Sequence, residues 1–239
     1  MSFSNVHFIL FKPQLAENIG ACARALKNFN FTKLKLVSPK INFPNEKVFA
    51  TSVGAKDIIN SSKIYSNFED AIKNTNCVIA TSSRIRKKNY KYLSINELKK
   101  INFKQKIAIV FGPEASGLTN NELSYANYVI KLPTSDKFQS LNLSHCVILL
   151  CHEIFKILSK KIKKFNSSYK NKQINKRELN KFVKFLVNSL DQIGFLQPDR
   201  KRKSMIQNMR TIFHKMDLSD KEMRTLLGIF SSLKDRKVD

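Results

Sequence analysis

Short apolar runs alternate with amphipathic stretches along the first 160 residues of the chain. The runs predict strands at 6–11, 33–37, 63–66, 77–81, 107–111 and 128–132. Helical spacing of apolar side chains predicts helices at 17–29, 46–59, 68–74, 94–100 and 142–158. Repeated alternation of strand and helix is typical of a parallel sheet covered on both faces. We therefore expect an α/β fold with a mostly parallel sheet and helices on both faces.

The pattern changes after this region. Residues 164–175 are polar and show no periodicity, which is typical of a linker. Three amphipathic helical patterns follow, near 176–193, 202–214 and 219–235. The sequence therefore predicts one domain at 1–160, a linker at 161–175 and a small all-α domain at 176–239.

The formal net charge of +25 favours a polyanionic partner. The 34 Lys, 9 Arg and 23 Asn residues also fit the bias of an AT-rich genome, which requires no binding function. The distribution of charge favours binding, because residues 156–239 carry +14 whereas the 155 residues before them carry +11. We therefore expect the basic helical domain to bind nucleic acid.

Two basic runs are candidates for contact with RNA. The first lies beside two tyrosines that can stack on bases, and a solvated loop is the alternative interpretation; it comprises Arg84, Arg86, Lys87 and Lys88. The second lies at the start of a predicted helix, where contact with RNA is favoured; it comprises Arg200, Lys201, Arg202 and Lys203.

Several classes of protein are disfavoured. No apolar run approaches the roughly 20 residues that span a bilayer, and no basic region precedes an apolar stretch at the N-terminus. The four cysteines lack C-x-x-C spacing and have apolar neighbours, which predicts reduced core thiols of a cytoplasmic protein. The set His145, Cys146, Cys151 and His152 looks like a metal cluster, but the two cysteines diverge on a helix. We expect it to pack in a helix core, against the sheet or a partner subunit, with no metal site.

Three polar segments lie where predicted strands and helices meet. They contain, in order, Asn18, Gly20 and Arg24; Gly112, Glu114 and Gly117; and Ser140, Leu141 and Asn142. Asn18 is a candidate helix cap, as is either Ser140 or Asn142. Gly20 permits close approach of another backbone, and Arg24 is a long cation among small residues. Ligands of open α/β sheets bind at the carboxyl ends of strands. Each segment alone also suits an ordinary turn or cap, whereas their combination favours one functional site.

In combination the segments resemble the three signature motifs of the SpoU/TrmH family of SPOUT methyltransferases. Residues 18–24 match N-x-G-x-x-A-R, residues 112–118 match G-x-E-x-x-G-L, and residues 140–142 match S-L-N. The C-terminal part resembles the tail of the TrmJ branch, at Gly194, Phe195, Asn208, Arg210, Phe213 and residues 227–229. The resemblance implies a deep trefoil knot in roughly residues 80–155, which no pattern of local structure would suggest.

The resemblance also implies a reaction: methyl transfer from S-adenosylmethionine to a ribose 2′-oxygen of tRNA, at the pyrimidine of anticodon-loop position 32. Implied catalytic residues are Arg24, Asn18, Glu114, Ser140 and Asn142. Implied cofactor-binding residues are Thr81, Ser82, Ser83, Gly112, Leu132, Gln139, Ser140 and Leu141. A guanidinium has no acceptor for a proton, so we expect Arg24 to hold the target phosphate and the developing alkoxide.

The implied partners are tRNA and a second copy of the chain, with the active site at the interface of a homodimer. Neither a membrane nor a metal is implied. Two alternatives stay open, namely the same chemistry on ribosomal RNA or another tRNA nucleotide, and a non-catalytic RNA-binding protein on the same fold. The intact set of motif residues argues against the second alternative.

Overall fold

In the computed structural model of the protein, residues 2–86, 90–159 and 173–235 are described. The strands are β1 (Val6–Phe11), β2 (Lys33–Val37), β3 (Lys63–Tyr65), β4 (Cys77–Thr81), β5 (Tyr92–Leu93), β6 (Ile107–Phe111) and β7 (Tyr128–Ile130). The helices are α1 (Ala16–Asn28), α2 (Glu46–Thr51), α3 (Lys56–Asn60), α4 (Phe68–Ile72), α5 (Asn120–Leu123), α6 (Leu143–Ser159), α7 (Lys176–Gln192), α8 (Asp199–Lys215) and α9 (Asp220–Asp235). Short 3-10 helices, η1 (Phe3–Asn5) and η2 (Ile95–Lys100), complete the described elements.

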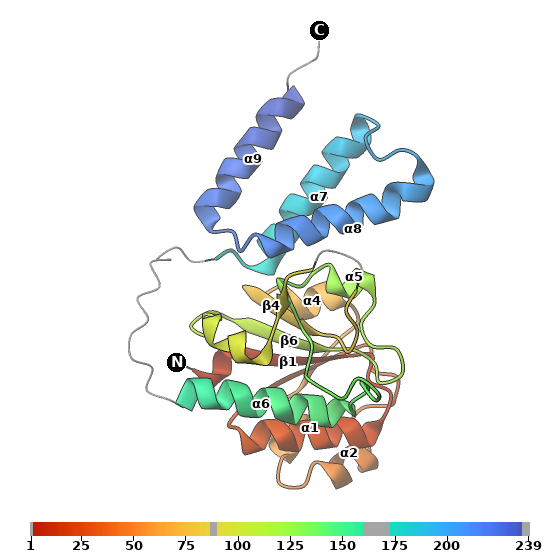
Figure 1. The fold of residues 1–239 in the computed structure, drawn as a ribbon, viewed down its shortest axis with the longest axis vertical. Helices are drawn as coiled ribbons and strands as arrows, with labels where there is room; N and C mark the ends of the chain where they lie inside the picture. The colour runs from red at the N-terminus through yellow and green to blue at the C-terminus, as the bar shows by residue number, and fades with distance from the viewer. Residues whose placement is uncertain (1, 87–89, 160–172, 236–239) are drawn as a thin grey trace.

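The seven strands form one sheet in the order β3-β2-β1-β6-β4-β7-β5, and every neighbouring pair is parallel. The predicted parallel sheet is thereby confirmed. Helices α1 and α6 lie side by side on one face (Figure 1), and α4 and α5 pack on the other. Because the strands point the same way, the loops after β1, β4, β6 and β7 all begin at one edge of the sheet.

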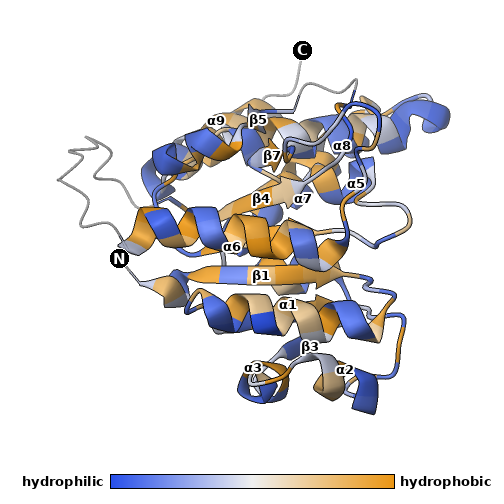
Figure 2. Cartoon of the chain, turned by 60° about the horizontal axis from the view of Figure 1, so that its bottom comes forward, coloured by the Kyte–Doolittle hydropathy of each residue, from blue (hydrophilic) through white to orange (hydrophobic). Residues whose placement is uncertain are grey.

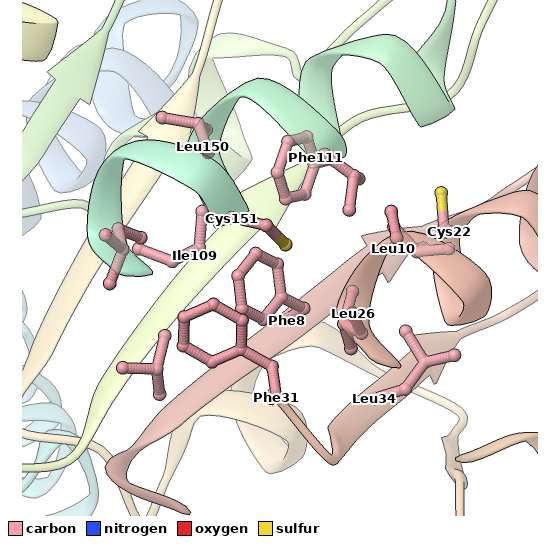
Figure 3. Close-up of a cluster of buried hydrophobic side chains, with 14 of the residues drawn as sticks. Phe8, Leu10, Cys22, Leu26, Phe31, Leu34, Ile109, Phe111, Leu150 and Cys151 are labelled. Carbon is pink, nitrogen blue, oxygen red and sulfur yellow. The ribbon is translucent and has the colours of Figure 1, made fainter. Parts of the chain in front are cut away.

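Side chains alternate between the two faces along each strand. On β1, Phe8 and Leu10 pack toward α1 and α6, whereas Ile9 and Phe11 join the cluster that includes α4 and α5. Figure 3 shows the first cluster, in which the rings of Phe8 and Phe31 have centroids 5.1 Å apart. Figure 2 shows β1 as a largely apolar strand between α1 and α6. Burial on both faces explains why the strand segments read as apolar runs.

The sequence prediction differs from the structure at two helices and is silent on two other elements. The helix expected at 46–59 divides into α2 and α3, because Gly54 has a φ of +76°, which interrupts a right-handed helix. Strand β5 and helix α5 are too short to show a period in the sequence. The α-helix expected at 94–100 is the 3-10 helix η2.

Gly20 confirms the expected close approach of two backbones. A Cβ at this position of α1 would overlap the carbonyl oxygen of Val48 and the side chain of Thr51, both on α2. Because Gly20 has no side chain, α1 can pack directly against α2 at this position.

Helices α7, α8 and α9 pack around an apolar core of their own. The rings of Phe182 and Phe213 meet edge to face at a centroid distance of 5.0 Å, and Phe182 also packs against Phe230. This unit lies on the side of the sheet that carries α4 and α5 (Figure 1).

Buried polar groups join the helical unit to the sheet domain. The side-chain amide of Asn127 donates to the carbonyl oxygen of His214 at 2.5 Å and to Asp217 at 2.8 Å. The ring Nδ1 of His214 lies 2.8 Å from the carbonyl oxygen of Tyr125. Burial lowers the pKa of His214 well below its ordinary value, so this nitrogen donates as part of a neutral ring. The two units are therefore packed together by specific contacts.

All four cysteines are free. Burial raises the pKa of Cys77 to about 12 and that of Cys146 to about 11, so these thiols stay protonated at neutral pH. Cys151 is buried as predicted.

His145 and His152 do not pack against the sheet, and their packing against a partner subunit stays a prediction. Both lie on the exposed side of α6, because residues 145, 148, 149 and 152 share the helix face that points away from the sheet. Among the described residues, no three His, Cys, Asp or Glu side chains are grouped to hold a metal ion. None of the described helices is long and apolar enough to cross a membrane.

Candidate active site

A cavity of about 320 Å³ opens at the carboxyl edge of the sheet, within the size range of small-molecule sites. Three loops line it, namely those that follow β4, β6 and β7, together with the start of α6. The loops meet because β6, β4 and β7 are adjacent in the sheet. Segments that lie far apart in the sequence thus converge on one space.

The structure brings together all eight residues that the sequence resemblance assigned to a cofactor. The cavity is lined by Thr81, Ser82, Ser83, Gly112, Leu132, Gln139, Ser140 and Leu141, and also by Glu114. Asn18, Arg24 and Asn142 do not belong to its lining. Of the five residues expected to be catalytic, two line the cavity and three lie outside its lining.

Gly112 is required by the shape of the loop after β6. A Cβ on this residue would overlap the backbone nitrogen of Leu118 and lie 2.5 Å from the carbonyl carbon of Gly117. Gly117 itself has a φ of +65°, which favours glycine. The loop therefore folds back on itself at the wall of the cavity, and only glycine permits this path.

Two residues that line the cavity each carry a buried polar atom without a partner among the described residues. The hydroxyl of Thr134 and the Nε of Arg86 have no hydrogen-bond partner among the described residues, and both side chains line the cavity. Buried polar groups are almost always paired in folded proteins. Their lack of protein partners favours a bound molecule that supplies polar atoms of its own.

Glu114 connects the three motifs. Its carboxylate accepts a hydrogen bond from the backbone nitrogen of Gln14 at 2.9 Å, from that of Leu15 at 3.3 Å, and from Asn18 Nδ2 at 2.9 Å. Asn18 Oδ1 in turn accepts from Asn142 Nδ2 at 3.0 Å. One chain of hydrogen bonds therefore holds the start of α1, the loop after β6 and the start of α6 in a fixed arrangement.

These contacts correct one predicted helix cap and confirm another. Asn18 is buried inside the first turn of α1 and does not cap it. The carboxylate of Glu114 instead binds the free N–H groups that precede α1, where a negative charge is stabilising. Asn142 does cap α6, because its Oδ1 accepts from the backbone nitrogen of Ser144 at 2.8 Å.

We expect Glu114→Gln to lower the free energy of unfolding by about 1–3 kcal/mol, because an amide would turn one donor toward the backbone N–H groups that the carboxylate accepts. The matched control is Glu17→Gln on α1, whose partner Lys47 is 3.7 Å away and whose side chain is 51% exposed. That control should change stability by no more than about 0.5 kcal/mol. Urea denaturation measures both, and equal stabilities would contradict a linking role for Glu114.

Arg24 is exposed on α1. Its neighbours Cys22, Ala23 and Ala25 are buried in the hydrophobic core. The exposed guanidinium therefore extends from a helix whose neighbouring side chains pack in the core. Arg24 is also absent from the lining of the cavity in its own chain.

As far as the structure describes them, the two basic runs lie at different hollows. Arg84 and Arg86 line the cavity, and an Nη of Arg86 donates to the carbonyl oxygen of Leu118 at 2.9 Å. Lys87 and Lys88 lie outside the described residues. In the second run, Arg202 and Lys203 line a separate groove, whereas Arg200 and Lys201 are exposed beyond its lining.

Three residues at the site were not assigned to it from the sequence. Gln14 accepts from the backbone nitrogen of Ala115 at 3.0 Å, and Thr134 and Cys146 line the cavity. Thr134 follows the end of β7, so the rule that ligands bind at carboxyl ends of strands could have indicated it. No periodicity or motif points to Gln14, whose partner is far away in the chain.

The chain matches two family models. The model of the SpoU rRNA Methylase family matches residues 5–152, and that of the tRNA methyltransferase TrmJ C-terminal domain matches residues 177–239. The first match contains all three motifs at the cavity. The second contains the three C-terminal helices.

Whole-chain relatives agree with both matches. The chain is 30% identical to a tRNA (cytidine/uridine/adenosine-2′-O-)-methyltransferase TrmJ from Pseudomonas aeruginosa, covering 95% of this chain and 92% of the relative. It is 31% identical to a tRNA (cytidine-2′-O-)-methyltransferase TrmJ from Methanocaldococcus jannaschii, covering 94% and 98%. The crystal structure of TrmJ from Z. mobilis superposes with a TM-score of 0.85 at 28% identity, covering 96% of this chain and 99% of that one.

Proposed function

The chain belongs to the SpoU methylase family, and on this premise we propose that it transfers a methyl group from S-adenosylmethionine to a ribose 2′-oxygen of tRNA. The observation that carries the proposal is the convergence of three motifs on one cavity of about 320 Å³. The hydrogen-bond chain through Asn18, Glu114 and Asn142 ties the same motifs together. Both relatives described above are named as tRNA 2′-O-methyltransferases, which supports tRNA as the substrate.

The residues at the cavity suit S-adenosylmethionine. Loop backbone and the side chains of Thr81, Ser82 and Gln139 offer donors and acceptors for adenine and ribose, and Leu132 and Leu141 offer apolar contacts. The hydroxyl of Thr134 is an unpaired buried group that a polar ligand would satisfy. When bound, the cofactor supplies the methyl group. Cys146 does not compete as a nucleophile, because burial raises its pKa to about 11.

The chain's own residues act by position and charge. Arg24 holds the phosphate beside the target ribose and stabilises the negative charge that develops on its 2′-oxygen, as a preorganised donor. Ser140 lies at the junction of cofactor and ribose, since it lines the cavity beside Leu141. Asn18, Glu114 and Asn142 are positioning residues that keep the motif loops in register. Alignment of the reacting atoms then provides much of the acceleration.

The active site requires a second copy of the chain. Arg24 does not line the cavity of its own chain, so we place the arginine of one protomer at the cavity of its partner. The exposed face of α6 offers the apolar contact surface for this homodimer, with Ile148 and Leu149 respectively 38% and 42% exposed. Leu15, at the start of α1, is 50% exposed and extends the apolar surface.

We expect Leu149→Glu to raise the dissociation constant of the dimer by on the order of tenfold or more, because it buries an unpaired charge at each symmetric contact. The matched control is Leu227→Glu on α9, whose leucine is 40% exposed on the C-terminal unit. Light scattering over a dilution series measures the mass of each variant against 27.6 kDa for one chain. A fully active wild-type protein that remains one chain at all concentrations would contradict the shared site.

The family also implies the knot. We infer a trefoil knot in roughly residues 80–155 of the sheet domain, followed by an all-α domain formed by α7, α8 and α9. The strand order supports the first part, because β6 inserts between β1 and β4 and β7 inserts between β4 and β5. The separate apolar core of the last three helices supports the second part.

The proposed target is the pyrimidine ribose at position 32 of the anticodon loop. The proposed location of the reaction is the cytoplasm. A transcript of an unmodified tRNA should gain one 2′-O-methyl group there, and the same tRNA with a 2′-deoxy nucleotide at that position should gain none. Mass spectrometry of nuclease fragments measures both. Methylation of ribosomal RNA fragments in place of tRNA would retain the chemistry and change the substrate, and failure to bind S-adenosylhomocysteine would contradict the function itself.

A further inference from the structure

A second concavity of about 380 Å³ lies between α5 of the sheet domain and α8 of the helical unit. We name it the α5–α8 groove. Its lining residues are Asn121, Asp199, Arg202, Lys203, Ile206, Gln207 and Arg210. The residues from α8 follow the spacing of one helix face. The groove therefore presents a single side of α8, and that side faces the sheet domain.

The groove has the composition of a site for a nucleic-acid backbone. Three cations line it against one carboxylate, that of Asp199. Asn121 and Gln207 contribute amides and Ile206 contributes an apolar surface, so the groove offers contacts for sugar and base beside those for phosphate. A face of α8 that contacted only solvent would not be lined by the side-chain amide of Asn121 on α5.

The cation at the base of the groove is held in place by the sheet domain. The guanidinium of Arg210 lies 4.2 Å from the ring centroid of Tyr125, and it donates to Asn121 Oδ1 at 3.3 Å and to Ser124 Oγ at 3.5 Å. A stacked guanidinium of this kind is preorganised and loses little side-chain freedom on binding.

The two cations at the rim differ in their present contacts. Arg202 forms an ion pair with Asp191 at 2.6 Å, and its side chain is 39% exposed. Lys203 is exposed, and it forms no ion pair with any residue that the structure describes. An exposed ion pair such as Arg202–Asp191 contributes little to stability. Arg202 can therefore exchange the carboxylate of Asp191 for a phosphate. Both side chains can therefore contact a phosphate.

The groove lies next to the cavity. Leu118 lines the cavity and Asn121 lines the groove, and three peptide steps of 3.8 Å place their Cα atoms within about 11 Å of each other. Arg86 of the cavity donates to the carbonyl oxygen of Leu118, and the hydroxyl of Tyr90 lies 3.4 Å from the carbonyl oxygen of Asn120. The wall of the cavity and the wall of the groove are thus one continuous piece of structure.

We propose that the α5–α8 groove binds the phosphodiester backbone of the RNA substrate at nucleotides that flank the methylated ribose. This inference rests on the proposed function and extends it, because it names a second contact point for the RNA and the helix face that forms it. With one segment of RNA in the groove and the target ribose at the cavity, α8 determines which nucleotide reaches the cofactor.

The test removes two charges from the groove and two from elsewhere on the same unit. The groove variant is Arg202→Ala with Lys203→Ala. The control is Lys221→Ala with Arg224→Ala on α9, which removes the same residue types, including an arginine paired with Asp220 at 2.6 Å. Point variants are preferred to truncation, because removal of the helical unit would expose the buried Asn127 and Tyr125.

For the groove variant, the KM for tRNA should rise about tenfold or more, with kcat at saturating RNA within about twofold of the wild type. The slope of log affinity against log salt should become shallower by roughly 1.5, since each phosphate contact releases counterions. The control variant should change KM by less than about twofold. Binding of S-adenosylhomocysteine and the unfolding midpoint should remain unchanged in both variants.

Direct RNA binding separates this inference from the proposed function. Fluorescence anisotropy with a labelled anticodon stem-loop reports the groove contact without any methyl transfer, and inorganic phosphate in large excess tests capture of a free anion. Equal losses in both double variants would mean diffuse attraction and would overturn the groove. If the wild type transfers no methyl group but the groove variant alone binds RNA more weakly, the proposed function fails and the groove stands.

Discussion

Replacing Arg24 by alanine should reduce methyl transfer to tRNA by on the order of 10²-fold or more, the loss found when a preorganised donor to developing charge is removed. The side chain is exposed on α1 among buried small residues. An ordinary surface arginine at such a place would change the rate only slightly when truncated. Methyl incorporation into unmodified tRNA at saturating cofactor measures the effect.

Two further variants sharpen that result. Arg24→Lys should recover little activity, because an ammonium keeps the charge but not the planar, two-pronged donor geometry. Lys27→Ala is the matched control, since Lys27 is an exposed cation on the same helix that pairs with Asp57 at 2.6 Å. Calorimetric titration of S-adenosylhomocysteine should give the same affinity for all three. Wild-type turnover in Arg24→Ala would remove Arg24 from the active site.

Mixing inactive protomers tests the shared site directly. Heterodimers of Arg24→Ala with a chain that cannot bind cofactor should regain activity at one of the two cavities, because one intact arginine then meets one intact cavity. No recovery under conditions of subunit exchange would favour an arginine that acts within its own chain.

Gly112→Ala should weaken binding of S-adenosylhomocysteine by on the order of 10- to 100-fold, the equivalent of about 1–3 kcal/mol of overpacking. A Cβ there overlaps backbone atoms of the loop, which cannot rotate out of the way as a side chain could. The loop must shift, and it forms a wall of the cavity. Calorimetric titration measures the affinity.

The control for this variant is Gly228→Ala in α9, where a Cβ would meet nothing within 4 Å. That substitution should leave cofactor affinity unchanged and raise stability by up to about 1 kcal/mol, as expected of alanine inside a helix. If Gly112→Ala lowers the unfolding temperature but binds the cofactor as well as the wild type, the close approach serves folding alone.

The sequence predicts the sheet well, for a physical reason. Strands buried on both faces must be apolar over their whole length, and β1 shows this pattern in a single window of residues. That the loops after the strands begin at one edge of the sheet follows from the parallel arrangement and one rule of topology. The assignment of Thr81, Gly112 and Leu132 to one cavity comes instead from the resemblance to the family.

The polar contacts of the site do not follow from local pattern. Asn18 looks like a helix cap in the sequence, yet its partner Glu114 is 96 residues away in the chain. The carboxylate takes over the cap, which frees Asn18 to bond Asn142. Such exchanges depend on which loops the sheet brings together, and a periodicity within α1 carries no information about them.

The division of the basic run at 200–203 shows the same limit at a surface. Four consecutive cations look equivalent in the sequence, whereas α8 turns Arg202 and Lys203 toward the groove and leaves Arg200 and Lys201 outside it. Only the position of the helix against α5 distinguishes them.

The buried contacts of Asn127 fix the position of the helical unit relative to the sheet domain. The Asn127 amide bonds both His214 and Asp217, and breaking such buried polar contacts costs free energy that a flexible tether would not have to supply. The distance between the α5–α8 groove and the cavity is therefore constant. If the groove and the cavity bind the RNA as proposed, we expect a nucleotide to be selected by its distance along the RNA from the groove, as well as by the identity of its base.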